Sequence, residues 1–226
     1  TNDGCSSPAE KCERLAQSGL SIAPEELVSC GHALAEWAVE NDACGARVRL
    51  LGSMGVPCYA EAAGFTVVRG PTEEPLRALV VGEDRYDWQG ELDDAFNLLV
   101  RHPQLPVLVP NPDDYFPGRR GRLHIGSGAV GRFLQALCRA HGDDIDIQYL
   151  GKPYAPVFRY AHHRLEQRCG RAIQRDRVIM LGDSLASDIR GGNAFGYRTG
   201  LLLTGITPPH RAPNTEIVPE QVFRTL

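Results

Sequence analysis

The amino-acid sequence predicts an α/β fold with a mainly parallel sheet. Apolar segments of strand length alternate with segments of helical periodicity along almost all of the 226 residues. Strands separated by helices of this length need crossover connections, which make neighbouring strands parallel. A chain of this length holds either one large core or a core with a second module. The Pro- and Gly-rich stretch at 110–121 is the best candidate for a crossing between domains.

The first half of the chain alternates strand and helix after an initial helix. Ser7-Pro8-Ala9-Glu10 is a capping box with Pro at the first helical position, and Gly19 ends the helix that it starts. A second apolar-periodic segment covers 31–39. Strands are then expected at 47–51, 66–68, 78–81 and 106–109, and helices at 54–63 and 92–100.

The same alternation resumes beyond the Pro- and Gly-rich stretch. We expect strands at 145–150, 178–181 and 199–203, and helices at 128–140, 156–166 and 188–194. The tail from Thr207 onward is rich in Pro and is expected to wrap the surface.

Composition and charge exclude several classes of protein. Hydrophobic residues make up 42% and charged residues 23%, which supports a buried core and excludes intrinsic disorder. The net charge of -4 provides no broad basic field, so nucleic acid is not an expected partner. No apolar run approaches the roughly 20 residues of a membrane span and no signal peptide opens the chain, so we expect a cytoplasmic location and no membrane partner. The seven cysteines are expected to be reduced.

The sharpest chemical signal is a strand that ends in Gly182-Asp183 and is followed by Asp188 at the next helix start. Sites in open α/β sheets form beyond the carboxyl ends of strands, so we expect Asp183 at such a site. A carboxylate there suits magnesium, which binds one or two protein carboxylates together with waters and substrate phosphate. The alternative interpretation is structural, with Asp183 shaping the turn and Ser187 or Asp188 capping the helix.

Two further segments carry groups suited to phosphate. Lys152 follows the strand at 145–150, and its ammonium can neutralise phosphate oxygens or a carboxylate. Thr1 and Asn2 precede the capped helix, where a hydroxyl, an amide and backbone N–H groups can hold an anion. In isolation, a surface lysine before a Pro and a polar chain end are the simpler interpretations of these two segments.

Taken in this order, Thr1-Asn2, the Gly-Lys-Pro at 151–153 and the Gly-Asp at 182–183 resemble motifs two, three and four of the haloacid dehalogenase (HAD) phosphatases. The sequence looks like the NagD-type, or nitrophenylphosphatase, branch. The resemblance implies a Rossmann-like parallel-sheet core. It also implies that Thr1, Asn2 and Lys152 bind the phosphoryl group, that Asp183 binds magnesium, and that Asp188 supports the metal shell.

The likeness covers almost the whole chain, including Val80-Val81-Gly82-Glu83, Asn111-Pro112-Asp113 and residues 197–205. In this branch an α/β cap is inserted between motifs two and three. That insertion implies a core of residues 1–28 and 119–226 and a cap of residues 29–118, which would exclude large substrates. Asn111, Asp113 and Tyr115 are candidates for substrate contacts, although an Asn-Pro-Asp-Asp turn explains the first two equally well. Caps of this branch often pair, so a homodimer through the cap is also expected.

The function that the resemblance implies is magnesium-dependent hydrolysis of a small phosphomonoester. In the family, the first Asp of an Asp-x-Asp motif attacks phosphorus to form an aspartyl phosphate, and the second acts as general acid and base. No core strand expected in residues 1–226 ends in such a motif. We expect the nucleophile upstream of Thr1. Without it, the protein would be a catalytically silent relative.

A dinucleotide-binding oxidoreductase is a competing interpretation. Residues Gly126 to Gly131 match the G-x-G-x-x-G fingerprint, and Asp146 lies at the distance expected for a ribose contact. The segment at 122–125 is too short and too polar for the buried strand that this motif needs, so close packing at a helix start is the simpler explanation.

A phospho-receiver domain is a third alternative, since it also combines carboxylates, a Thr and a Lys-Pro. Receiver domains carry no large insertion between the Thr and the Lys, so the length of this chain argues against that class. His162 and His163 lie side by side on an expected helix, point to different faces and are expected at the surface.

Overall fold

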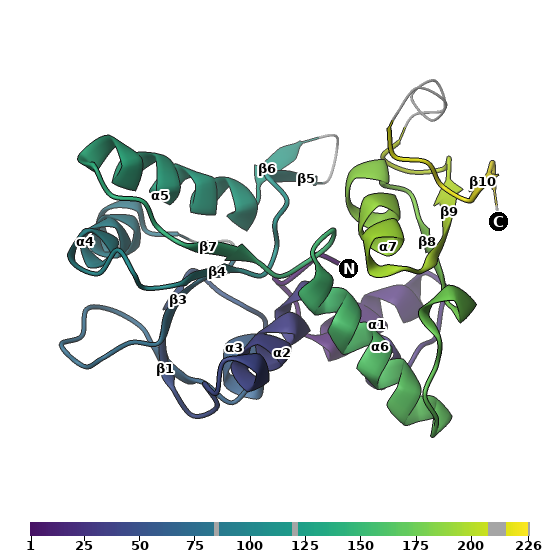
Figure 1. The fold of residues 1–226 in the computed structure, drawn as a ribbon, viewed down its shortest axis with the longest axis horizontal. Helices are drawn as coiled ribbons and strands as arrows, with labels where there is room; N and C mark the ends of the chain where they lie inside the picture. The colour runs from purple at the N-terminus through teal and green to yellow at the C-terminus, as the bar shows by residue number, and fades with distance from the viewer. Residues whose placement is uncertain (84–85, 119–121, 208–215, 226) are drawn as a thin grey trace. The chain divides into compact units, whose positions relative to one another are not determined.

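The computed structural model describes residues 1–83, 86–118, 122–207 and 216–225, which form two compact units, Thr1–Gly151 and Lys152–Leu226. The first unit is built on a five-stranded sheet and the second on a three-stranded sheet, and the strands of both sheets are parallel (Figure 1). The expected α/β class is therefore confirmed. No helix within these described ranges combines the length and the apolar character that a membrane crossing needs.

The sheet of the first unit has the strand order β2-β1-β3-β4-β7. Because the order reverses between β1 and β3, the carboxyl ends of these two strands form a topological switch point, where open α/β sheets bind ligands. The strands are β1 (Arg47–Leu51), β2 (Thr66–Val68), β3 (Ala78–Val81), β4 (Val107–Val109) and β7 (Ile147–Tyr149).

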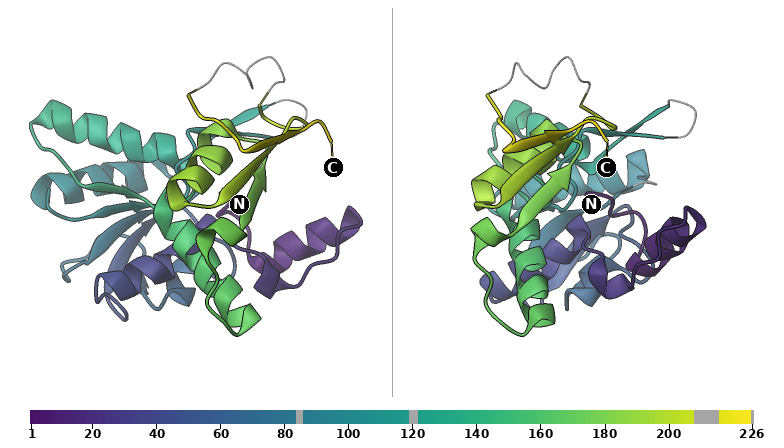
Figure 2. Two further views of the ribbon diagram at one scale, coloured as in Figure 1. Left: turned by 45° about the vertical axis from the view of Figure 1, so that its right-hand side comes forward. Right: turned by 90° about the vertical axis from the view of Figure 1, so that its right-hand side faces the viewer.

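Helices cover both faces of this sheet (Figure 1). On one face lie α2 (Ala33–Glu40) and α3 (Tyr59–Ala62), and on the other lie α4 (Asp93–Arg101) and α5 (Ser127–His141), which run side by side in Figures 1 and 2. Crossovers that proceed in opposite directions from β1 place their helices on opposite faces, because each crossover is right-handed. The core under α4 and α5 is apolar, with Leu79, Val81, Leu99, Val107 and Leu134 among its buried members.

Two expected helices of this unit have different bounds in the structure. The helix expected at 54–63 is reduced to α3, because Gly55 adopts a positive φ of 71° and Pro57 lacks an N–H, so neither supports a regular first turn. The helix expected at 92–100 is α4, which follows a π-helical turn, η3 (Trp88–Leu92).

The N-terminal helix α1 (Pro8–Gln17) forms as the capping box predicted, with reciprocal hydrogen bonds between Ser7 and Glu10. The short turns η1 (Pro24–Glu26) and η2 (Cys30–His32) lead from it to α2. Lys11 of α1 is buried, and its Nζ donates to Asp3 O at 2.5 Å, Ser29 Oγ at 3.0 Å and Tyr59 Oη at 3.2 Å. The ammonium thus ties α1 and the first residues to the layer of α2 and α3.

The Pro- and Gly-rich stretch forms a hairpin that the sequence did not predict. Its strands β5 (Tyr115–Pro117) and β6 (Leu123–Ile125) are antiparallel. Because β6 is exposed and antiparallel, it is not the buried parallel strand that a dinucleotide fold requires before its glycines. Gly128 instead allows close packing, since a Cβ there would lie 2.1 Å from the Pro112 carbonyl oxygen.

The boundary expected between residues 118 and 119 lies inside the first unit. Helix α5 packs on the same core as α4, and β7 pairs with β4, so the residues that follow the hairpin continue the first sheet. The change of unit comes at Gly151, directly before Lys152.

The second unit has the strand order β10-β9-β8, with β8 (Ile179–Gly182), β9 (Arg198–Leu202) and β10 (Gln221–Phe223). Its helices are α6 (Ala155–Cys169) and α7 (Arg190–Phe195), and two short turns, η5 (Arg175–Arg177) and η6 (Leu185–Ile189), precede β8 and α7. The tail therefore contributes a strand as well as surface segments, and its residues 208–215 lie outside the described ranges.

An aromatic cluster joins α6 to α7 and β9 in the second unit. His162 is buried there, against our expectation, because its ring packs on Phe195 and Tyr197 and its two nitrogens contact Tyr197 Oη at 3.0 Å and Ile173 O at 2.9 Å. His163 is exposed, as expected.

Replacing Lys11 tests how the first segment is attached. We expect Lys11→Met to lower the free energy of unfolding by about 1–3 kcal/mol, because the hydrogen bonds of a buried ammonium are lost. Arg14→Met is the matched control on the same helix, since the Arg14–Asp3 ion pair is exposed and should change stability by less than about 1 kcal/mol. Urea denaturation of the complete protein measures both, and equal effects would contradict this account.

Candidate active site

Several chemically active side chains gather at the carboxyl edge of the five-stranded sheet. Glu83 follows β3 and is buried, with 3% of its surface exposed. Its Oε1 accepts the Gly4 N–H at 2.7 Å, and its Oε2 accepts the Cys5 thiol at 3.0 Å. The first residues of the chain therefore lie against the switch point between β1 and β3.

The predicted residues Asn2, Asn111 and Asp113 come together at the same edge. Asn2 Nδ2 donates to Asp113 Oδ1 at 3.1 Å, and Asn111 Oδ1 accepts the Asp113 N–H at 2.9 Å. The Asn111 side chain also hydrogen-bonds Glu83. Tyr115 lies on β5, with 64% of its surface exposed.

Backbone and thiol contacts fix the Thr1–Asn2 segment. The Thr1 hydroxyl accepts the Asp3 N–H at 3.2 Å, and the Thr1 carbonyl accepts the Cys30 N–H at 2.8 Å. The Cys30 thiol donates to the Asn2 carbonyl at 3.1 Å. Burial raises the pKa of Cys30 to about 12, so this thiol is a neutral hydrogen-bond donor rather than a nucleophile.

Lys152 and Asp188 form an ion pair within the second unit. Lys152 Nζ donates to Asp188 Oδ1 at 2.5 Å, and Asp188 Oδ2 accepts the Ser184 N–H at 3.1 Å. The Asp188 side chain is 5% exposed and that of Lys152 is 18% exposed, so water screens the pair only weakly. Gly182 leaves room for this carboxylate, since a Cβ at Gly182 would lie 2.3 Å from Asp188 Cγ.

Asp183 follows β8, as its motif predicts. Its Oδ2 accepts the Ile206 N–H at 3.0 Å, and its carbonyl accepts the Thr207 N–H at 3.0 Å. The Thr207 hydroxyl in turn accepts the Leu185 N–H at 3.1 Å. Asp183 is thereby held at the strand end by the segment that follows β9.

The donor set fits a magnesium ion only in part. Among the residues described, no three His, Cys, Asp or Glu side chains gather as a metal-binding group. Asp188 is committed to Lys152 and Ser184, whereas Asp183 is a partly exposed carboxylate at a strand end. Asp183 is therefore the better candidate for a direct ligand, and Asp188 is placed to orient Lys152.

Comparison with known proteins agrees with these features. The HAD-hydrolase-like family model matches residues 149–226. The chain is 26% identical over all 226 residues to an acid sugar phosphatase of Staphylococcus aureus and spans 80% of its length. A p-nitrophenyl phosphatase from Archaeoglobus fulgidus is similar in structure, with a TM-score of 0.79 and 26% identity over 99% of this chain and 81% of that one. Residues 149–226 thus match the HAD-like hydrolases, and the whole chain is similar to phosphatases.

A second similar structure contains a metal ion. A glycerol phosphate phosphatase from Mycobacterium tuberculosis, solved in complex with magnesium, matches with a TM-score of 0.80 and 26% identity over 99% of this chain and 63% of that one. The parallel-sheet α/β fold of this chain is thus shared with solved phosphatases over nearly its whole described length.

Sequence reasoning missed Glu83 as a candidate site residue. The signal was present, because Val-Val-Gly-Glu ends an apolar strand in a carboxylate, just as Leu-Gly-Asp does at Asp183. Its hydrogen bonds to residues near the N-terminus, 79 positions away, could not be read from that signal.

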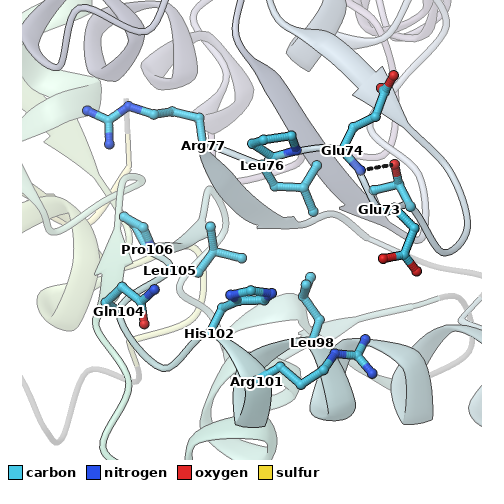
Figure 3. Close-up of a pocket in the computed structure, with 12 residues that line it drawn as sticks. Glu73, Glu74, Leu76, Arg77, Leu98, Arg101, His102, Gln104, Leu105 and Pro106 are labelled. Atoms are coloured by element: carbon cyan, nitrogen blue, oxygen red, sulfur yellow. Dashed lines mark hydrogen bonds between the residues drawn. The ribbon is translucent and has the colours of Figure 1, made fainter.

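A cavity of about 600 Å³ lies away from these residues. It is lined by residues 72–77, which precede β3, by residues 104–106, which precede β4, and by the end of α4 (Figure 3). Because these segments lead into strands, the cavity lies at the amino edge of the sheet, opposite to Glu83. Figure 3 shows Leu76, Leu98 and Leu105 at this space, and no candidate residue lines it.

The fit of Asp188 beside Gly182 can be tested by a double-mutant cycle. We expect Gly182→Ala to destabilise the complete protein by about 1–3 kcal/mol, because the added methyl group overlaps the Asp188 carboxyl group. In an Asp188→Ala background the same change should cost less than about 0.5 kcal/mol, since the overlap is gone. Chemical denaturation measures all four proteins, and additive effects would show that the two residues do not meet.

The buried Glu83 predicts a pH-dependent stability. Burial raises the pKa of its carboxyl above the ordinary value of 4.5, while Cys5, Gly4 and Asn111 oppose this shift by donating hydrogen bonds. The folded state therefore binds this proton more tightly than the unfolded state does. Proton binding stabilises the folded protein below pH 4.5, and this stabilisation is lost as the pH rises through the raised pKa.

Thermal unfolding at about pH 4 to pH 7 tests this dependence. We expect Glu83→Gln to gain stability relative to the natural protein as the pH rises. Glu61→Gln, which changes an exposed glutamate of α3, is the control. The assignment is wrong if the two variants show the same pH dependence.

Proposed function

We propose that this protein hydrolyses small phosphomonoesters in a magnesium-dependent reaction. The observation that carries the proposal is the ion pair between Lys152 and the buried Asp188, in the same unit as Asp183 at the end of β8. A half-buried ammonium that a carboxylate holds in place can also bind a second anion. The names of the relatives support the reaction class, since they act on sugar phosphates, nitrophenyl phosphate and glycerol phosphate.

The proposed roles of the residues follow their chemistry. Thr1, Asn2 and Lys152 bind the oxygens of the phosphoryl group, through hydrogen-bond donors and one positive charge. Asp183 binds magnesium. Asp188 holds the Lys152 ammonium in position through the 2.5 Å hydrogen bond.

The proposed reaction proceeds through a covalent intermediate. A carboxylate oxygen of an aspartate upstream of Thr1 forms a bond to phosphorus, and the bond between phosphorus and the ester oxygen breaks. The leaving oxygen takes a proton from a second aspartic acid of the same motif, and water then hydrolyses the aspartyl phosphate. Lys152 offsets charge on the phosphoryl oxygens in both steps. Magnesium, when bound, would offset the negative charge of the nucleophile and the phosphate.

We also propose that the five-stranded sheet is the inserted cap. The sequence suggested that the cap ends at residue 118, but β7 pairs with β4, so the proposed cap extends to Gly151. Loops of the cap would select the substrate by size and polarity. A homodimer through the cap and a cytoplasmic location stay predictions.

Asp183→Asn tests the proposed metal ligand. We expect this change to lower magnesium-dependent release of phosphate from nitrophenyl phosphate by the complete protein more than about a hundredfold, because a neutral amide binds magnesium poorly. Asp176→Asn, an exposed aspartate of the same unit, is the matched control and should retain activity. Unchanged turnover of Asp183→Asn would reject the assignment.

Magnesium binding can be measured without turnover. We expect added magnesium to raise the melting temperature of the complete protein after treatment with a chelator, and to leave that of Asp183→Asn unchanged. A protein that binds magnesium in this way but releases no phosphate from a panel of phosphomonoesters would be the catalytically silent relative.

A further inference from the structure

Glu83 is a buried carboxylate that the proposed reaction does not use. It follows β3 at the switch point, with 3% of its surface exposed. A buried carboxylate costs free energy that an apolar residue of similar size would not, because the charge loses its hydration. Packing alone would be served better by an apolar residue at this position.

The two carboxylate oxygens hold the residues directly after Asn2. Oε1 accepts the Gly4 N–H at 2.7 Å, and Oε2 accepts the Cys5 thiol at 3.0 Å. A Cβ at Gly4 would lie 2.7 Å from Oε1, so the backbone approaches the carboxylate as closely as glycine allows. Glu83 therefore fixes where the chain runs beyond Asn2.

The same carboxylate reaches Asn2 by a second route. Asn111 hydrogen-bonds Glu83, and Asn111 Oδ1 accepts the Asp113 N–H at 2.9 Å. Asp113 Oδ1 then accepts Asn2 Nδ2 at 3.1 Å. Together with the chain from Asn2 to Gly4, these contacts close a ring, which we call the Glu83 ring: Asn2, Gly4, Glu83, Asn111 and Asp113.

We propose that Glu83 is a positioning residue, which orients the side chain of Asn2 for phosphoryl binding through the Glu83 ring. This inference rests on the proposed function, because it assigns a role towards the same phosphoryl group. The backbone N–H and the thiol of Cys30 hold Thr1 and Asn2 independently of Glu83. The specific contribution of Glu83 is therefore the orientation of the Asn2 amide rather than attachment of the segment.

Two substitutions separate positioning from packing. Glu83→Leu removes both acceptor oxygens of Glu83 but fills the space with an apolar side chain, and Glu83→Gln keeps one acceptor oxygen. We expect kcat for nitrophenyl phosphate to fall roughly tenfold to a hundredfold in Glu83→Leu and less in Glu83→Gln, because a misplaced binding group loses its contact with the reacting phosphoryl group. Stability at neutral pH should stay equal or rise in both variants.

A stability control calibrates this result. Leu134→Ala creates a cavity in the core of the same unit, away from the Glu83 ring, and should lower stability by about 2–5 kcal/mol. Its kcat under conditions where it is folded should be close to that of the natural protein. If loss of activity in the Glu83 variants only parallels loss of stability, as a structural role predicts, the inference is overturned.

A double-mutant cycle identifies the residue through which Glu83 acts. In an Asn2→Ala background, Glu83→Gln should change kcat by less than about twofold, because the amide that it orients is absent. If the effects of Asn2→Ala and Glu83→Gln on kcat multiply, the inference is overturned. It is also overturned if both Glu83 variants keep a kcat within threefold of the natural value.

The outcome for Asp183→Asn separates this inference from the proposed function. If Asp183→Asn abolishes turnover while Glu83→Leu does not change it, the function stands and the positioning role is wrong. If the natural protein releases no phosphate, the proposed function is wrong. In that case kcat cannot be measured, and the positioning role is tested by the affinity of the natural protein and of Glu83→Leu for inorganic phosphate. Equal affinities overturn the role, and a lower affinity of the variant supports it.

Discussion

Parallel strands that end side by side expose polar backbone groups at one edge, and the first unit depends on how those groups are paired. Buried N–H and C=O groups without partners cost several kcal/mol in total, so each must be matched locally. Backbone groups beyond β1 and β3 pair with each other, since Ser53 and Glu83 exchange N–H to carbonyl hydrogen bonds. The Glu83 side chain then accepts the Gly4 N–H and the Cys5 thiol, so the first residues of the chain are attached to the same edge.

In the second unit, one ion pair satisfies a buried carboxylate. A carboxylate as buried as Asp188 requires a partner, and Lys152 and the Ser184 N–H supply it. The ion pair also requires Gly182, because any side chain there would occupy the place of the Asp188 carboxyl group. The same arrangement holds the Lys152 ammonium in place, as its proposed phosphate-binding role requires.

Most elements of the fold followed from periodicity, because burial of one helix face or of whole strands repeats along the chain. The helix at 54–63 was overestimated, since Gly55 and Pro57 prevent its first turns. The boundary predicted at 118/119 falls on the hairpin of β5 and β6 inside the first compact unit, because Pro and Gly mark turns of every kind. Strand β10 was missed because its three residues carry too short a pattern.

The sequence by itself determined the α/β class, the order of the elements and the polar residues that follow β4, β7 and β8, because these depend on neighbours within a few positions. Tertiary structure decided which strand ends are adjacent, that β7 belongs to the first sheet, and that Glu83 contacts Gly4 and Asp113 contacts Asn2. The last two contacts span 79 and 111 positions. Local periodicity carries no information about such pairs, whose partners are set only when the sheet forms and the buried polar groups must be satisfied.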